Sequence, residues 1–229
     1  MRALLFLGTK YICPCCGWRL RAFTHGGASL RVRPSGYCPR CNSKARHRRD
    51  WLFLEQKTEL FTRPLRLLHI SPKYSLSRRL VKATNLRYVA GDISTRMNLS
   101  LLMDLTATPI RCDTFDAAIC IHVLEHVLDD RRAISEMYRV LKPGAWALIS
   151  VPIRLDQPTF EDPSITTAAE RRRAFGESSH VRYYGRDLTR RLEECGFRVQ
   201  LDLAQDLDKA MAAKYGLLDD ENVFYCSKA

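Results

Sequence analysis

Apolar and polar residues alternate along most of the chain with two periods, one typical of strands and one typical of helices. Short apolar runs that indicate buried strands occupy residues 65–70, 86–93, 115–124, 145–151 and 222–227, while residues 197–203 alternate strictly. Three segments with helical spacing lie among these runs, at residues 75–83, 129–141 and 186–197. We therefore expect an α/β fold in which helices cover a parallel sheet.

A further helix is predicted before this regular pattern begins. In residues 43–61, Trp51, Leu54 and Phe61 recur at helical spacing, and Pro64 is expected to end the helix because proline cannot continue one. The helix separates a cysteine-rich beginning from the strand and helix pattern. It is expected to join two parts of the molecule.

The length of 229 residues and the hydrophobic content of 46% suit one sizeable core and a small appendage. We divide the chain into a small module (1–49), a linking helix (50–64) and a large domain (65–229). No apolar run approaches the roughly 20 residues of a membrane-spanning helix. The short apolar stretch near the start leads into cysteines rather than into a cleavage site. We expect a cytoplasmic protein without a membrane partner.

Positive charge is concentrated in the small module. The net charge is +12, and residues 1–49 hold 11 Lys and Arg without one Asp or Glu, whereas the remainder is nearly neutral. Such a segment presents a positive surface, which serves either solubility or an anionic partner such as nucleic acid. The absence of interleaved acids favours the partner.

Four cysteines of the same module have the spacing of a metal site. Cys13 and Cys16 form one Cys-x2-Cys pair, and Cys38 and Cys41 form a second pair after 21 intervening residues. Each pair can deliver two thiolates from one tight turn, and four thiolates complete a closed, structural zinc site. A redox role for one pair is the alternative. Cys15 lies between two proposed ligands and is interpreted as the spare thiol.

Acids and imidazoles follow the predicted strands. In doubly wound sheets, ligands bind at the carboxyl ends of the strands, where the strand order reverses. Asp92 follows the second strand, Asp104 lies in the segment "MDLTATP", and His122, Glu125 and His126 lie at the exit of the strand 115–124. Asp92 lies about 20 residues beyond the first strand, the offset at which an acid commonly binds ribose hydroxyls. Capping of a turn is the alternative for either aspartate.

The block from "MDLTATPIRCDTFDAAICIHVLEHVLDD" through "AISEMYRVLKPGAWALISVP" resembles the class I S-adenosylmethionine-dependent methyltransferases. That family has an acidic loop, a Phe-Asp pair, a strand ending in a His-Val-Leu-Glu-His type sequence and a Leu-Lys-Pro-Gly turn. The resemblance covers roughly residues 65–229. It implies a Rossmann-like, doubly wound and mostly parallel seven-stranded sheet, here with a small N-terminal zinc-ribbon module.

By this resemblance, Asp92 accepts the ribose hydroxyls of the cofactor, and Asp104 accepts its adenine amino group. The loop around His69 and Ser71 would hold the methionine moiety. The family usually has a glycine-rich loop there, whereas this chain reads "HISPKYS", and Ser71 before Pro72 is expected to be extended. His69 could instead be a core histidine. The complete implied set for S-adenosyl-L-methionine is His69, Ile70, Ser71, Asp92, Ile93, Asp104, Leu105 and Ile121.

Methyl transfer needs a base only when the acceptor is a hydroxyl or a protonated amine. The candidate catalytic residues are His122, His180, Glu125 and His126. The connection 153–185, which includes a short predicted helix, is too long for a simple turn and is interpreted as a cover over the acceptor. In it, Arg182, Tyr183 and Tyr184 are expected to face the substrate, although the two tyrosines could simply pack the cover.

The favoured function is methyl transfer to an oxygen or nitrogen atom of a small-molecule or carbohydrate-like acceptor. An anionic acceptor is compatible with this function, because the basic module could recruit it. One alternative is an RNA methyltransferase that grips its substrate through the basic zinc ribbon. Another is a non-catalytic scaffold that binds nucleic acid. A dehydrogenase is disfavoured because the fingerprint glycines are missing. The sequence leaves the oligomeric state open.

Overall fold

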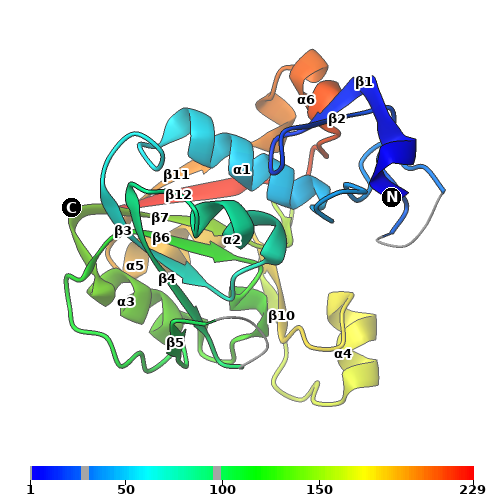
Figure 1. Ribbon diagram of the computed structural model, residues 1–229. Coiled ribbons are helices and arrows are strands. Elements are labelled where there is room, and N and C mark those ends of the chain that lie inside the picture. Colours follow the sequence, from blue (N-terminus) through cyan, green and yellow to red (C-terminus); the bar gives the residue numbers. More distant parts are fainter. Residues whose placement is uncertain (1, 27–30, 95–98) are drawn as a thin grey trace. The chain divides into compact units, whose positions relative to one another are not determined.

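The computed structural model describes residues 2–26, 31–94 and 99–229 (Figure 1). The chain folds into two compact units, and each contains segments that are far apart in sequence. Unit 1 consists of Met1–Pro64, Lys73–Arg87 and Asp202–Val223. Unit 2 consists of Leu65–Pro72, Tyr88–Leu201 and Phe224–Ala229.

A seven-stranded sheet organises unit 2, in the order β11-β12-β7-β6-β3-β4-β5. β6 pairs in parallel with β3 and β7, β5 pairs in parallel with β4, and β12 pairs antiparallel with β7. The predicted α/β fold with a mostly parallel seven-stranded sheet is confirmed. The strands are β3 (Leu65–Ile70), β4 (Leu86–Asp92), β5 (Leu101–Leu102), β6 (Phe115–Ile121), β7 (Leu141–Ser150), β11 (Phe197–Asp202) and β12 (Val223–Lys228).

The strand order reverses between β3 and β6. The chain runs from β3 outward to β4 and β5, and then returns to the other side of β3 for β6 and β7. In an open parallel sheet, the loops that leave the two strands at such a point diverge and leave a crevice at their carboxyl ends. The residues that follow β3 and β6 therefore flank the expected ligand position.

One face of this sheet packs against α3 (Asp130–Val140) and α5 (Leu188–Glu194). Ala133, Ile134 and Met137 of α3 are fully buried, as their helical spacing predicts, and they join the sheet residues in one core. Asp129 begins the helix by accepting a hydrogen bond from the Arg132 amide. The helix ends at Val140, one residue before the end of the predicted segment, because β7 begins at Leu141.

The connection after β7 has its own small sheet. It contains β8 (Ile153–Arg154), β9 (Phe160–Glu161), α4 (Ala168–Phe175) and β10 (Arg182–Gly185), and its strands have the order β8-β10-β9. Thr167 and Glu170 form a capping box at the start of α4, and Gly176 ends it with φ = 84°. The 3-10 helix η2 (Leu124–His126) precedes α3.

Unit 1 contains the cysteine module and two segments from later in the sequence. Its elements are η1 (Arg2–Phe6), β1 (Leu7–Cys13), β2 (Trp18–Leu20), α1 (Ala45–Lys57), α2 (Tyr74–Leu80), η3 (Ala204–Asp206) and α6 (Lys209–Tyr215). Trp51 and Leu54, whose spacing predicted the helix, are buried in α1. The helix ends at Lys57, well before Pro64, because Thr58 is extended and its hydroxyl donates to the Leu54 carbonyl.

Arg48 is the polar centre of unit 1. Its guanidinium is buried and donates to the carbonyls of Gly36, Ser43, Tyr215 and Gly216, at 2.6–3.0 Å. The group also lies 3.8 Å from the centre of the Phe23 ring. Gly216, with φ = 60°, approaches so closely that a Cβ atom there would lie 2.5 Å from Phe23. Segment 202–223 is thereby part of the same core as the cysteine module.

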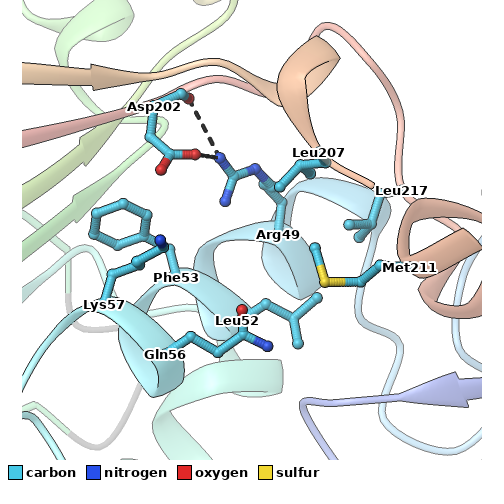
Figure 2. A pocket seen from close by; sticks show the side chains of 9 residues that line it. All are labelled: Arg49, Leu52, Phe53, Gln56, Lys57, Asp202, Leu207, Met211 and Leu217. Atoms are coloured by element: carbon cyan, nitrogen blue, oxygen red, sulfur yellow. Dashed lines mark hydrogen bonds and ion pairs between the residues drawn. The ribbon is translucent and has the colours of Figure 1, made fainter. Parts of the chain in front are cut away.

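A small pocket lies between α1 and the segment that follows β11 (Figure 2). An ion pair between Arg49 and Asp202 borders its largely apolar lining. None of the predicted metal, cofactor or acceptor residues belongs to this pocket. The lining residues are Arg49, Leu52, Phe53, Gln56, Lys57, Asp202, Leu207, Met211 and Leu217. Within the described part of the chain, every helix is too short or too polar to cross a membrane.

Candidate active site and cysteine cluster

The four predicted cysteines converge on one point in unit 1. Their sulfur atoms all lie within 4.8 Å of one another. Cys13 and Cys41 are separated by 3.6 Å between their Sγ atoms, and Cys16 and Cys38 by 3.7 Å. Four thiolates bound at about 2.3 Å to a tetrahedral zinc ion lie about 3.8 Å apart, so the cluster has the dimensions of such a site.

Two similar turns produce this convergence. Gly17 follows the first cysteine pair with φ = 72°, and its amide donates to the Cys13 carbonyl at 2.8 Å. Asn42 follows the second pair with φ = 59°, and its amide donates to the Cys38 carbonyl at the same distance. Asparagine tolerates the left-handed conformation better than most residues, which explains how the second turn forms without glycine.

The remaining cysteine of the first turn points elsewhere. Cys15 is buried and donates from its Sγ atom to the His47 carbonyl at 3.3 Å. It does not belong to the group of four converging sulfur atoms. Its geometry therefore agrees with its interpretation as the spare thiol.

In unit 2, the two candidate acids lie at the same end of neighbouring strands. Asp92 ends β4 and is aligned with Leu102 of β5, and the Met103 amide donates to the Asp92 carbonyl at 2.8 Å. Asp104 follows two residues after Leu102. Both carboxylates thus lie at the carboxyl edge of the sheet, as the order of the elements predicts.

Each of these aspartates organises a local turn. Ser94 donates its amide and hydroxyl to Oδ1 of Asp92, and Thr106 does the same to Oδ1 of Asp104. The Thr106 amide, and then its hydroxyl, lower the pKa of Asp104, so the group is a carboxylate at neutral pH. The turns use one carboxylate oxygen of each acid. Ile93, 72% exposed, lies beside Asp92 and offers an apolar surface.

Other members of the implied cofactor set are inside the domain. Ile70, Leu105 and Ile121 are buried, so they can contribute only main-chain groups at the strand ends. His69 is fully buried, and its Nδ1 atom lies 3.0 Å from the hydroxyl of Tyr88. Burial raises the pKa of Tyr88. His69 is therefore a core residue, and its buried side chain stabilises β3.

Two residues at the switch point have left-handed backbone conformations. Ser71 follows β3 with φ = 46°, and His122 follows β6 with φ = 51°. The expected extended conformation of Ser71 is wrong, because its amide turns to donate to the Gly91 carbonyl at 2.7 Å. Such conformations cost non-glycine residues roughly 1–3 kcal/mol, and they concentrate at functional sites.

His122 and Glu125 form a pair at the end of β6. Their Nδ1 and Oε1 atoms lie 2.9 Å apart, and the Glu125 side chain is 1% exposed. The His122 amide donates to the Ser150 carbonyl at the end of β7. A buried carboxylate at Nδ1 fixes the orientation and tautomer of the imidazole, which leaves Nε2 as the atom that can exchange a proton with a ligand.

The other two candidate histidines come from two different loops and contact each other. The rings of His126 and His180 are in edge contact, with 4.7 Å between their centres. The Val181 amide donates to the Glu125 carbonyl at 2.9 Å, so the start of β10 is held against η2. Burial, reinforced by His126, lowers the pKa of His180.

The three residues expected to face the substrate have different surroundings. Arg182 is buried and donates to Glu161 and to the carbonyls of Leu124 and Leu128. Tyr184 is buried too, and its hydroxyl donates to Asp130 at 2.8 Å. Tyr183 is half-buried and lies beneath the Arg154 guanidinium. Arg182 and Tyr184 thus support the connection, whereas Tyr183 remains at its surface.

Sequence reasoning overlooked Ser150 at the end of β7. Its hydroxyl oxygen is buried, has no hydrogen-bond partner among the described residues, and belongs to the residue paired with Ile121. The only signal in the sequence is a serine that closes the apolar run of β7. Ser150 adds a polar group beside His122.

Residues 68–149 match a family model described as a methyltransferase domain. The crystal structure of the [4+2]-cyclase SpnF is 16% identical, with a TM-score of 0.59 over 90% of this chain and 88% of that one. An S-adenosylmethionine-dependent methyltransferase from Mesorhizobium loti is 16% identical, with a TM-score of 0.57 over 77% and 96%. A Burkholderia thailandensis 1,6-didemethyltoxoflavin-N1-methyltransferase with bound S-adenosylhomocysteine is 14% identical, with a TM-score of 0.54 over 81% and 78%.

These structural similarities establish a common fold, and the cyclase among them shows that the fold alone does not determine the reaction. The family model is more specific, because it spans β3 to β7 and thus the strand ends that carry Asp92 and His122. The match and the strand order agree with the resemblance of the central sequence block. Residues 68–149 thus match a methyltransferase domain, and the chain has the fold of the S-adenosylmethionine-dependent methyltransferases to which it is similar.

Proposed function

We propose that this enzyme transfers a methyl group from S-adenosylmethionine to an oxygen or nitrogen atom of a small-molecule or carbohydrate-like acceptor. The observation that carries the proposal is the arrangement in unit 2 of two carboxylates at the edge of β4 and β5 and an imidazole and carboxylate pair at the end of β6. The two carboxylates are suited to binding the hydroxyl and amino groups of a nucleoside. The imidazole and carboxylate pair is suited to removing a proton from the acceptor.

The described residues fit the cofactor. Asp92 retains a carboxylate oxygen for the ribose hydroxyls, and the exposed side chain of Ile93 can pack against the adenine ring. The carboxylate of Asp104 is suited to the adenine amino group, with the Leu105 amide beside it. Main-chain groups of Ser71 would contact the methionine end. When bound, the cofactor supplies an electrophilic methyl group on a sulfonium.

The contribution of the protein is placement and proton removal. Holding an acceptor atom in line with the methyl group replaces a bimolecular encounter by a preorganised one. His122, oriented by Glu125 through Nδ1, would accept the acceptor's proton at Nε2. The connection 153–185 would cover the acceptor and exclude water, with Tyr183 at its surface.

The four-cysteine cluster supports a structural role for zinc. The sulfur geometry fits a closed tetrahedral site, with no position left for a substrate. Zinc would therefore stabilise unit 1 and would not take part in methyl transfer.

Cofactor binding is the direct test of the proposal. Calorimetric titration of the purified chain with S-adenosylmethionine should show binding with one site per chain. Incubation with candidate hydroxyl and amine acceptors should then produce S-adenosylhomocysteine and a product heavier by one methyl group. An absence of heat and of thermal stabilisation at millimolar cofactor would exclude the enzymatic proposal and favour the scaffold.

Replacing Asp92 by asparagine should weaken cofactor binding by about 10–100-fold, because a charge-assisted hydrogen bond contributes about 1.5–3 kcal/mol. The measurement is the Kd for S-adenosylhomocysteine by calorimetry. Asp162→Asn is the matched control, since Ser164 donates to Asp162 in the same way as Ser94 donates to Asp92. Equal affinities of the two variants would show that Asp92 only shapes its turn.

Unit 1 favours RNA as a second candidate substrate. Arg40 is exposed, and its guanidinium lies 4.6 Å from the centre of the Trp18 ring. Lys44 and Lys10 lie over Tyr37 and Tyr11 in the same way. Cations and ring faces together are what single-stranded RNA binds. The positive surface is smaller than the sequence indicates, however, because Arg48 and Arg49 are buried.

If RNA is the substrate, its binding should weaken as salt increases, with log K falling by about 0.7 per contacted phosphate for each unit of log salt. Arg40→Ala should lower the affinity and reduce that slope. Arg111→Ala, an exposed arginine of unit 2, should change neither. Fluorescence anisotropy with a labelled single strand measures both quantities. Binding that does not depend on salt would contradict this candidate.

A further inference from the structure

A second group of metal-binding side chains lies in unit 2, apart from the cysteine cluster. One ligand atom from each of Glu125, His126 and His180 lies within 4.8 Å of the others. The three residues come from two loops, η2 and the segment before β10. Two imidazoles and one carboxylate form a known ligand set for Fe²⁺ and related divalent cations. The three ligands occupy one face of the coordination sphere and leave the other positions open.

The loops are held together by contacts that do not involve these three side chains. Arg182 donates to the carbonyls of Leu124, the first residue of η2, and Leu128, which follows η2. The Val181 amide donates to the Glu125 carbonyl. These bonds fix the main chain on either side of the group. The convergence is therefore built into the fold of unit 2.

The hydrogen bonds of the group suit metal ligands. Nδ1 of His126 lies 3.3 Å from the Ser179 carbonyl, and a proton on that nitrogen leaves the lone pair on Nε2. Metal-binding histidines commonly donate their other ring proton to a carbonyl in this way. Nδ1 of His180 is buried and has no hydrogen-bond partner among the described residues. His122, through Nδ1, orients the Glu125 carboxylate from behind.

We propose that Glu125, His126 and His180 bind a divalent cation. Ligands at about 2.1 Å from such an ion lie about 3–3.4 Å apart. The three ligand atoms of this group all lie within 4.8 Å of one another, so only small side-chain movements are needed to bind an ion. Three protein ligands leave positions open for a hydroxyl or carboxylate oxygen of the acceptor. Only that last assignment rests on the proposed methyl transfer.

Cobalt(II) is the probe for this site. The protein is first loaded with one equivalent of Zn²⁺ to fill the cysteine cluster, and Co²⁺ is then titrated while visible absorption is recorded. We expect one further ion per chain, with ligand-field bands but without the charge-transfer absorption of a cobalt thiolate. No such bands at millimolar Co²⁺, or bands only with thiolate charge transfer, would overturn the proposal.

Variants of the proposed ligands test whether the Co²⁺ absorption comes from this site. His126→Ala and His180→Ala should each weaken Co²⁺ binding by about 10–100-fold. His25→Ala, which removes an exposed histidine of unit 1, should leave binding unchanged. Circular dichroism and S-adenosylhomocysteine affinity measured on the same samples show whether each variant is folded and whether the cofactor site is intact. Equal Co²⁺ affinity in folded His126→Ala, His180→Ala and parent proteins would refute the site.

Discussion

Replacing Cys41 by serine should release zinc and unfold unit 1. Structural zinc contributes about 10–16 kcal/mol in zinc-finger peptides, which is comparable to the entire stability of a typical domain. Cys41 is buried beside Cys13 and Ser43, so its loss leaves three converging thiols without their fourth partner. Zinc content by mass spectrometry and hydrogen exchange of the α1 amides measure the two effects.

The chain contains a matched control for this variant. Cys15→Ser changes a cysteine of the same turn that lies outside the cluster, and a serine hydroxyl can still donate to the His47 carbonyl. This variant should keep one zinc ion per chain and full protection of α1. If Cys41→Ser also kept its zinc and its protection, the cluster would not be a structural metal site.

Replacing His122 by asparagine should reduce the rate of methyl transfer to a hydroxyl acceptor by about 10²–10⁴-fold, the usual contribution of a general base. Asparagine tolerates the left-handed backbone of this position, so the loop after β6 should keep its conformation. Cofactor affinity should change little. Single-turnover kinetics and calorimetry measure the two quantities separately.

A variant of Glu125 tests whether His122 and Glu125 act together in proton removal. Glu125→Gln can still accept a hydrogen bond from Nδ1 but cannot stabilise an imidazolium, so its effect should be smaller than that of His122→Asn. The double variant should be no slower than His122→Asn alone, because residues that act together are not additive. Additive losses, or an unchanged rate in His122→Asn, would show that the proton leaves by another route.

The strands and helices of unit 2 could be predicted because their residues are buried in regular patterns. The apolar runs of β3 and β6 and the α3 face of Ala133, Ile134 and Met137 lie where periodicity places them. The sequence also placed Asp92 at the end of a predicted strand, whereas β5, the short strand before Asp104, was not predicted. These features depend on local spacing and on the general rule that parallel strands share a carboxyl edge.

The conformations of individual site residues could not be predicted. Ser71 and His122 have left-handed backbones because their amides reach carbonyls on other segments, at Gly91 and Ser150. The environment of Arg182 likewise depends on partners distant in sequence, so an arginine that resembled a substrate ligand is a support for η2. Such contacts override local preferences, and the sequence carries no signal for them.

The sequence also did not predict which later segments belong to unit 1. The four cysteines indicated a metal module, but nothing in residues 202–223 marks them as part of the same core. Their role depends on Arg48, an ordinary basic residue in sequence and a buried donor to four carbonyls in the structure. Because charge patterns do not distinguish a buried arginine from an exposed one, α1 was predicted only as a link.

The contacts of Arg48 also bear on the order of events during translation. Two of the carbonyls that receive its protons belong to Tyr215 and Gly216, which leave the ribosome more than 160 residues after the arginine. Until those two residues emerge, the Arg48 guanidinium lacks two of its four carbonyl acceptors and remains hydrated. The cysteine module therefore completes its core only after residues 215 and 216 have been synthesised.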